Sequence, residues 1–299
     1  MFIKQFLALT VIVATFTSCG NRTDADDESL MEYPDTIKTS VLNVGGELFS
    51  IPSPLQTALL VQKIGLPYDK TMLNATNLVG TYNTDEMRAL NLGVYGADLG
   101  YVSLYSQTQD ALGYLASVKQ LTDKLGLSAA FDVPTMQRLQ NNITNKDSMM
   151  ALVSLAYRAS DAYLKNNQRA EIGNLILTGG WIESMHFSTR AYLTNANDQI
   201  RYRIAEQKQA LSSIIRILEQ TEGSQLDRLR SMLAELMKTY EGIGFRYVYE
   251  EPKTDSVKKI TYINSRTEIT VTDDQLRQIG SQVSAIRNMI INSTEKKAG

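Results

Sequence analysis

Residues 179–186 bring several chemically versatile side chains together, including the single tryptophan, Trp181, and the single histidine, His186. Glu183 and His186 are three residues apart and Arg190 follows four residues later, so a helix would place all three on one face. A Glu-x-x-His pair is half of the ligand set of a di-iron site in a helical bundle. The full site needs a second such pair, which a chain with one histidine cannot supply. We therefore expect a hydrogen-bonded Glu–His–Arg row here, and neither a metal nor a cofactor.

Two aspartates stand at positions that helical spacing assigns to apolar faces. Asp98 lies among Val94, Tyr95 and Tyr101, and Asp161 continues the face of Val153. An ionised carboxylate in such surroundings is costly unless it is paired. We predict that each pairs with an arginine or tyrosine across the fold. The alternative is a ligand-binding role, whose candidate residues are Asp98, Tyr101, Asp161, Trp181, Glu183 and His186.

Few of the residues and motifs that other known catalytic sites require are present in the sequence. A Ser-His-Asp hydrolase would need His186 as its base, and no Gly-x-Ser-x-Gly elbow presents a nucleophile. Walker-type and zinc-protease motifs are also absent from the sequence. Paired carboxylates among Asp98, Asp161 and Glu183 would suit glycoside hydrolysis, but nothing in the sequence sets their separation. We predict that the protein is not an enzyme.

Charge composition argues against nucleic acid as a partner. Lys and Arg total 30 against 32 Asp and Glu, which gives a net charge of −2, and the basic residues are scattered. Proteins that bind nucleic acid usually carry a basic patch or stripe. We therefore expect no nucleic-acid partner.

Apolar spacing and capping residues predict a series of amphipathic helices that position these side chains. Proline at the first helical position and Gly65 after the last turn delimit the first helix, and Asn145 and Thr272 are suitable N-caps for two others. The expected helices span 54–64, 94–125, 146–164, 170–193, 198–219, 225–240 and 273–290, with a further helical region opening at 84.

Three glycines, Gly93, Gly96 and Gly100, share one face of the expected 94–125 helix. Glycine inside a helix costs about 1 kcal/mol relative to alanine, so three on one face indicate a close approach to the backbone. We expect a neighbouring helix there, with a ligand as the alternative.

The hydrophobic period changes from helical to alternating between residues 245 and 272. This pattern predicts a β-hairpin or a three-stranded meander. The fold class is therefore all-α, an antiparallel helical bundle with a small β element near 245–272.

The N-terminus has the organisation of an export signal. Lys4 precedes an apolar segment, 6–16, which is too short to span a bilayer, and small residues lead to Cys19, the single cysteine. This arrangement resembles the lipobox of Gram-negative lipoproteins, and the resemblance implies cleavage before Cys19 and its diacylation. Gly20 after the cysteine favours the outer membrane by the same resemblance, on the periplasmic face or the cell surface.

We accordingly divide the chain into a signal peptide (1–18), a lipid anchor with a disordered polar tether (19–45) and a helical domain with its β element (46–299), the first helix starting near Ser53. Segments 51–54, 90–101 and 179–183 resemble an uncharacterised family of Gram-negative helical outer-membrane lipoproteins. That resemblance implies location and fold only.

Two functions remain open at this point. The first is a lipid-anchored accessory protein that contacts an envelope protein, which predicts an exposed apolar patch on the folded domain. The alternative is a small-molecule-binding lipoprotein with a pocket near Asp98 and the Trp181–His186 segment.

Overall fold

The computed structural model describes residues 40–44, 47–51, 54–129, 133–143, 145–221, 223 and 226–292. Within this part the protein is mostly helical with small two-stranded antiparallel sheets, which confirms the predicted fold class. The α-helices are α1 (Pro54–Lys63), α2 (Asp85–Leu104), α3 (Thr108–Lys124), α4 (Val133–Asn141), α5 (Lys146–Asn166), α6 (Ala170–Thr194), α7 (Asp198–Ala205), α8 (Lys208–Glu219), α9 (Asp227–Glu241) and α10 (Asp273–Ile291). Two short 3₁₀ helices, η2 (Lys70–Met72) and η3 (Thr76–Thr81), link α1 to α2.

Side-chain caps fix several of these helices where the sequence predicts them. The Asn145 side chain accepts a hydrogen bond from the Ser148 amide at the start of α5. Thr272 and Gln275 form a complete capping box at the start of α10. Each cap satisfies amide groups that a helix N-terminus leaves without an intrahelical partner.

Two long helices that the sequence analysis predicted are in fact interrupted. The 94–125 segment divides at residues 105–107 into α2 and α3, because Ser106 adopts a left-handed conformation (φ 56°). The amide of Gln107 then donates to the carbonyl of Val102 over 2.9 Å, the closing bond of a Schellman cap. The 198–219 segment divides at Glu206 and Gln207 into α7 and α8.

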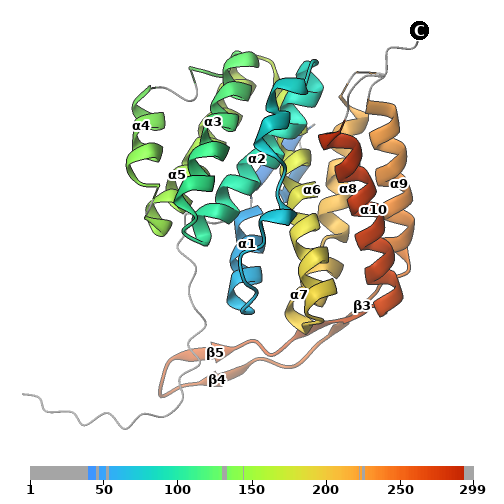
Figure 1. Ribbon diagram of the computed structural model, residues 1–299. Helices are drawn as coiled ribbons and strands as arrows, with labels where there is room; N and C mark the ends of the chain where they lie inside the picture. Colours follow the sequence, from blue (N-terminus) through green and yellow to red (C-terminus); the bar gives the residue numbers. More distant parts are fainter. Residues whose placement is uncertain are drawn as a thin grey trace, which may run out of the picture. The chain divides into compact units, whose positions relative to one another are not determined.

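Helices α2 and α6 form the centre of the fold, with α3 on one side and α10 on the other (Figure 1). Helix α6 also contacts α1, α5, α7 and α8. Most residues of both central helices are buried, which is the pattern of a helix that is surrounded by neighbours.

Glycines bring the backbones of α2 and α6 into direct contact. A Cβ atom at Gly179 would lie 1.9 Å from the carbonyl oxygen of Leu90, and one at Gly93 would lie 2.0 Å from that of Ile176. A Cβ at Gly100 would instead meet the Leu55 side chain at 3.3 Å. The expected close approach of a neighbouring helix is thus confirmed at Gly93.

The strands form three antiparallel pairs. β1 (Ser40–Val44) pairs with β2 (Glu47–Ile51), and β2 contacts α8. β1 lies in the segment predicted to be a disordered tether (19–45), and β2 lies at the start of the predicted helical domain, where no strand was expected. β3 (Gly244–Val248) pairs with β6 (Arg266–Thr270), and β4 (Lys253–Asp255) pairs with β5 (Ile260–Tyr262). Segment 244–270 is therefore one long hairpin and not a three-stranded meander. We call it the β arm.

Several predictions concern residues outside the described part of the chain. The signal peptide, Cys19 and the tether up to residue 39 are among them, as are Ser53 and the side chains of Val153 and Asp161. Helix α4, by contrast, is described but was not predicted. Among the described residues, no helix has the length and apolar character needed to cross a membrane.

Candidate functional site

Glu183 of α6 forms a buried ion pair with Arg287 of α10. Arg287 Nε donates to Glu183 Oε2 at 2.5 Å and Nη2 donates to Oε1 at 2.7 Å. Nη2 also donates to the carbonyl oxygen of Met72 at 3.0 Å, so the guanidinium joins three segments of the chain. Burial lowers the pKa of Arg287, but attraction to Glu183 outweighs burial and raises this pKa above its ordinary value. The two parallel hydrogen bonds to one carboxylate are the strong form of this interaction.

The Asp98 carboxyl lies beside this pair and is itself fully buried. Its Oδ2 accepts a hydrogen bond from the Asn74 amide at 3.1 Å. Burial and the negative charge of Glu183 raise its pKa well above the ordinary value, against a smaller opposing effect of Arg287. In the ionised form, Oδ1 has no hydrogen-bond partner among the described residues. A proton on Asp98 removes this deficit because the protonated carboxyl can donate to Glu183.

His186 is neutral in the folded protein. Burial lowers its pKa to about 4, although Glu183 acts in the opposite direction. Its hydrogen-bond partner is the backbone of Met72. The expected Glu183–His186–Arg190 row does not form, since Glu183 is engaged by Arg287 and Arg190 lies 3.9 Å from the carboxylate of Asp69.

Tyr101 and Trp181, the other candidate residues whose side chains the structure describes, are also engaged by neighbouring protein groups. The Tyr101 hydroxyl accepts from the Asp69 amide at 3.1 Å, and its ring centroid lies 5.0 Å from that of Phe187. Trp181 is buried and donates from Nε1 to Gln207 Oε1 at 3.1 Å. Because Trp181 is two residues from Glu183 on α6, the two side chains point to different sides of the helix. The structure thus groups Asp98, Glu183 and His186, and leaves Trp181 outside this group.

Sequence reasoning missed Arg287 and Asn74, which complete the group. Arg287 is one turn after Val283 and one residue after Ile286, on the apolar face of α10. A cation at such a position is a signal of a buried anion, by the same logic that singled out Asp98. Asn74 lies between η2 and η3, in a segment with no periodicity, so the sequence carries no comparable signal for it.

The chemistry open to this group is limited by its burial. Asp98 and Glu183 are close enough to share a hydrogen bond, yet both are fully buried and Arg287 covers Glu183. No group of three or more His, Cys, Asp or Glu side chains among the described residues is arranged to hold a metal ion. A cavity of about 280 Å³ lies elsewhere, between α8 and α9, and its lining consists of Ile215, Leu218, Glu219, Arg230, Ser231, Leu233 and Ala234. The group therefore has the character of a structural core network.

The β arm presents the opposite situation, with large side chains in contact with solvent. Tyr247 is 66% exposed and Tyr249 is 68% exposed. The register places Phe245 opposite Ile269 and Tyr247 opposite Thr267, and because side chains alternate between faces, these residues share one face. We call residues 245, 247, 249, 267 and 269 the aromatic face of the arm.

The other face of the same strands is occupied by charges. Arg246 lies opposite Glu268 and forms an ion pair with it. Arg266 pairs with Glu250 and with Glu268, in the latter case at 3.1 Å. One face of the arm is therefore internally neutralised and the other is apolar and aromatic.

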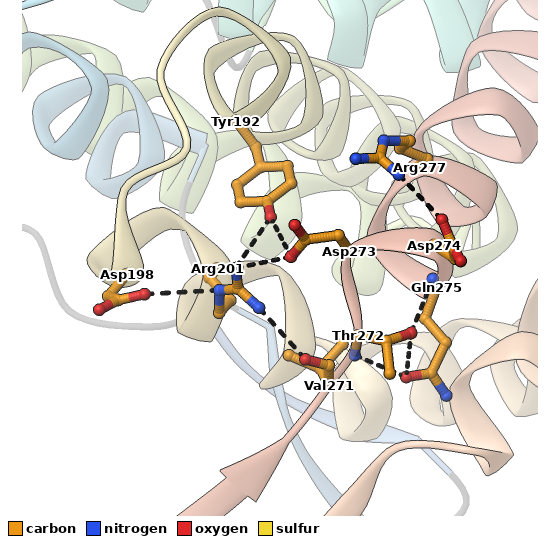
Figure 2. A network of polar contacts seen from close by, with 9 residues as sticks. All are labelled: Tyr192, Asp198, Arg201, Val271, Thr272, Asp273, Asp274, Gln275 and Arg277. Atoms are coloured by element: carbon orange, nitrogen blue, oxygen red, sulfur yellow. Dashed lines mark hydrogen bonds and ion pairs between the residues drawn. The ribbon is translucent and has the colours of Figure 1, made fainter.

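A polar network fixes the point where the arm joins the helices (Figure 2). Arg201 of α7 donates to the carboxylate of Asp273 at 2.6 Å and to the carbonyl of Val271 at 3.2 Å. The Tyr192 hydroxyl of α6 donates to the same Asp273 oxygen at 2.8 Å. Gln275, from the capping box, donates to the Gly242 carbonyl on the other side of the arm at 2.9 Å. Both strands at the base of the arm are thus attached to the bundle.

Comparisons of the chain with family models, curated proteins and solved structures give no match.

Proposed function

We propose that the protein is an accessory lipoprotein of the Gram-negative outer membrane, held by an acylated Cys19, that contacts another envelope protein through the aromatic face of its β arm. The observation that carries the proposal is the exposure of Tyr247 on β3 and of Tyr249 just after it, beside a strand pair that no third strand extends within the described residues. This exposure supports the proposal, because exposed apolar surface on a folded domain is typical of sites of protein interaction.

The chemistry of this face suits a protein partner. Tyrosine is enriched at protein interfaces because its ring supplies apolar contact and its hydroxyl a hydrogen bond. β3 pairs only with β6 among the described strands, so the outer edges of both can accept an added strand from a partner. The alternative function, a small-molecule pocket near Asp98 and Trp181–His186, has less support because Asp98, Trp181 and Glu183 are almost completely buried.

The test is photo-crosslinking in the native envelope. A photoreactive amino acid at Tyr247 samples the aromatic face, and the same amino acid at Tyr202, a 44% exposed tyrosine of α7, is the matched control. We expect one defined protein adduct from position 247 that position 202 does not give. No adduct at 247, or the same set from both positions, would contradict the proposal.

The anchor is tested separately by metabolic labelling with a palmitate analogue. The wild-type chain should carry the label, and the Cys19→Ala variant should lose it. Labelling that survives the substitution would refute acylation at Cys19 without bearing on the arm.

A further inference from the structure

The outer end of the β arm differs in chemistry from the aromatic face nearer the helices. Strands β4 and β5 are joined by the turn 256–259, in which Lys259 has a left-handed conformation (φ 54°). Val257 in this turn is 92% exposed, and Ile263 just beyond β5 is 77% exposed. We call residues 253–263 the tip of the arm.

The tip is cationic, in contrast to the whole chain. It holds three exposed lysines, Lys253, Lys258 and Lys259, against one acidic residue, Asp255, whereas the chain has a net charge of −2. No ion pair within the described part of the chain engages any of the three lysines. The Asp255 carboxylate instead accepts hydrogen bonds from the amides of Val257 and Lys258, both at 3.0 Å.

The register gives the tip two unlike faces. Lys253 lies opposite Tyr262 and Asp255 lies opposite Ile260, so these four residues share one face. The other face carries Thr254 and Thr261, whose hydroxyl groups hydrogen-bond to each other at 3.1 Å. Lys253, Tyr262, Ile260 and Asp255 therefore lie together on one side, and the exposed Val257 lies in the turn that joins the two strands.

We propose that the tip of the β arm rests on an anionic lipid surface. The apolar side chains of Val257 and Ile260 would enter the boundary between headgroups and acyl chains, and the Tyr262 ring would lie at headgroup level. The three lysines would reach the headgroup phosphates with their ammonium groups while their stems stay in apolar contact. The positive charge of the tip is the feature that selects an anionic bilayer over a neutral one.

This inference goes beyond the proposed function, because it concerns residues 253–263 and not the aromatic face. A membrane contact at the tip would hold the arm at the bilayer surface whether or not Tyr247 and Tyr249 meet a protein. The two proposals therefore fail separately, one at position 247 in a crosslinking experiment and the other at position 257 in a lipid experiment.

The experiment places a tryptophan at the tip and measures its quenching by brominated lipid. The full-length Val257→Trp protein is reconstituted into vesicles of brominated phosphatidylglycerol or brominated phosphatidylcholine. Trp181 is 1% exposed and gives a constant background. Leu112→Trp, at a 42% exposed position of α3, is the control. It measures the quenching of an exposed tryptophan away from the tip in a protein that is bound to the same vesicles.

We expect strong quenching of Val257→Trp in anionic vesicles and weak quenching in neutral ones, with Leu112→Trp unquenched in both. An N-terminal acyl anchor would hold the protein on either vesicle, so the difference between the lipids reports the tip alone. Quenching at 257 no greater than at 112, or equal quenching in the two lipids, would overturn the proposal. If quenching at 257 is no greater than at 112, the partner of the tip would instead be an anionic protein surface.

Charge removal gives a graded second readout. Adding Lys258→Gln and Lys259→Gln to Val257→Trp should weaken partition of the tip into anionic vesicles about 25-fold, since one lysine near such a surface contributes roughly fivefold. Lys63→Gln with Lys124→Gln removes the same charge from exposed lysines of α1 and α3, and should leave the quenching unchanged. An equal effect of both pairs would show that net charge, and not the tip, directs binding.

Discussion

The contact between α2 and α6 makes a prediction in which two effects of opposite sign compete. Gly179→Ala improves the helix propensity of α6, which on its own stabilises the fold by about 1 kcal/mol. The same methyl group would lie 1.9 Å from the carbonyl oxygen of Leu90 and 2.7 Å from its carbonyl carbon. Both atoms belong to the backbone of a buried helix, so neither can rotate away as a side chain does.

Relief of this overlap requires α2 and α6 to move apart along their whole contact. Overpacking a core costs about 1–3 kcal/mol, and a backbone obstacle places this site at or above the upper end of that range. After the propensity gain, Gly179→Ala should lower the free energy of unfolding by about 2 kcal/mol or more. In a fold of this size that corresponds to a melting temperature about 4–8 °C lower.

Two other glycines provide matched controls for the same substitution. A Cβ at Gly113, within α3, would meet the Thr76 methyl group at 3.7 Å, an ordinary contact, so Gly113→Ala should stabilise the protein by up to about 1 kcal/mol. A Cβ at Gly100 would lie 3.3 Å from the end of the Leu55 side chain, which can shift, and its effect should fall between the other two.

Thermal and urea unfolding followed by circular dichroism at 222 nm would measure all three variants. The order of stability should be Gly113→Ala, then Gly100→Ala, then Gly179→Ala. If Gly179→Ala does not accumulate in folded form, the order of the other two still tests the reasoning. A Gly179→Ala protein as stable as Gly113→Ala would refute the direct contact of the two backbones.

Three further predictions concern the buried polar group. Arg287→Met should destabilise the fold by about 3–5 kcal/mol in urea unfolding, because it leaves Glu183 buried without its cation, whereas Arg277→Met at an exposed pair should cost less than about 1 kcal/mol. Asp98 keeps its proton to a higher pH in the folded state than in the unfolded state, so wild-type stability should lose a contribution as pH rises above about 4. Asp98→Asn stays neutral, so between pH 4 and pH 7 its free energy of unfolding should rise relative to that of the wild type in parallel urea titrations. A variant that becomes less stable relative to the wild type as the pH rises would contradict this. The single imidazole, His186, should titrate near pH 4 when it is followed by proton NMR. Its contribution to the free energy of unfolding should therefore be complete above pH 6.5 and decrease as the pH falls toward 4. A measured pKa near 6.5 would show that the side chain is accessible to solvent.

Helix ends were predictable where the residue type reveals the cap, as Gly65 does after α1, and one was missed where it does not. Asn145 and Thr272 act through their own oxygen atoms, and their residue types reveal that capacity. The end of α2 depends on Ser106 in a left-handed conformation, which is usually a position of glycine. A serine there gives no warning in the sequence, so α2 and α3 appear continuous.

In the candidate site, likewise, some features could be predicted from residue types and others could not. Asp98 could be recognised locally because it stands among apolar neighbours at helical spacing, and Glu183 because of its three-residue spacing to His186. Their pairing could not, because Arg287 is 104 residues away from Glu183 along the chain and meets it only once α6 and α10 pack. Residue type therefore identified buried charges, and tertiary packing decided which of them neutralise each other.

The β arm shows a different limit of sequence reasoning. Alternation of Phe245, Tyr247 and Tyr249 correctly predicted strands, and such alternation ordinarily indicates one buried face. Here the sheet has only two strands and the described helices leave Tyr247 and Tyr249 exposed. The sequence could predict the strands and the alternation of their side chains. Whether other elements pack over Tyr247 and Tyr249 depends on the tertiary structure.

The buried polar group and the exposed arm are connected through α10. A buried ion pair adds little net stability over apolar packing, but a fixed two-pronged geometry restricts how two helices can slide. Arg287 binds α10 to Glu183 of α6 and to the Met72 carbonyl, while the first residues of α10 carry the Asp273 and Gln275 contacts that attach the arm (Figure 2). A shift of α10 along α6 would therefore break both sets of contacts together. The polar group, which sequence reasoning considered as a possible ligand pocket, therefore fixes the position of the helix that directly follows the β arm.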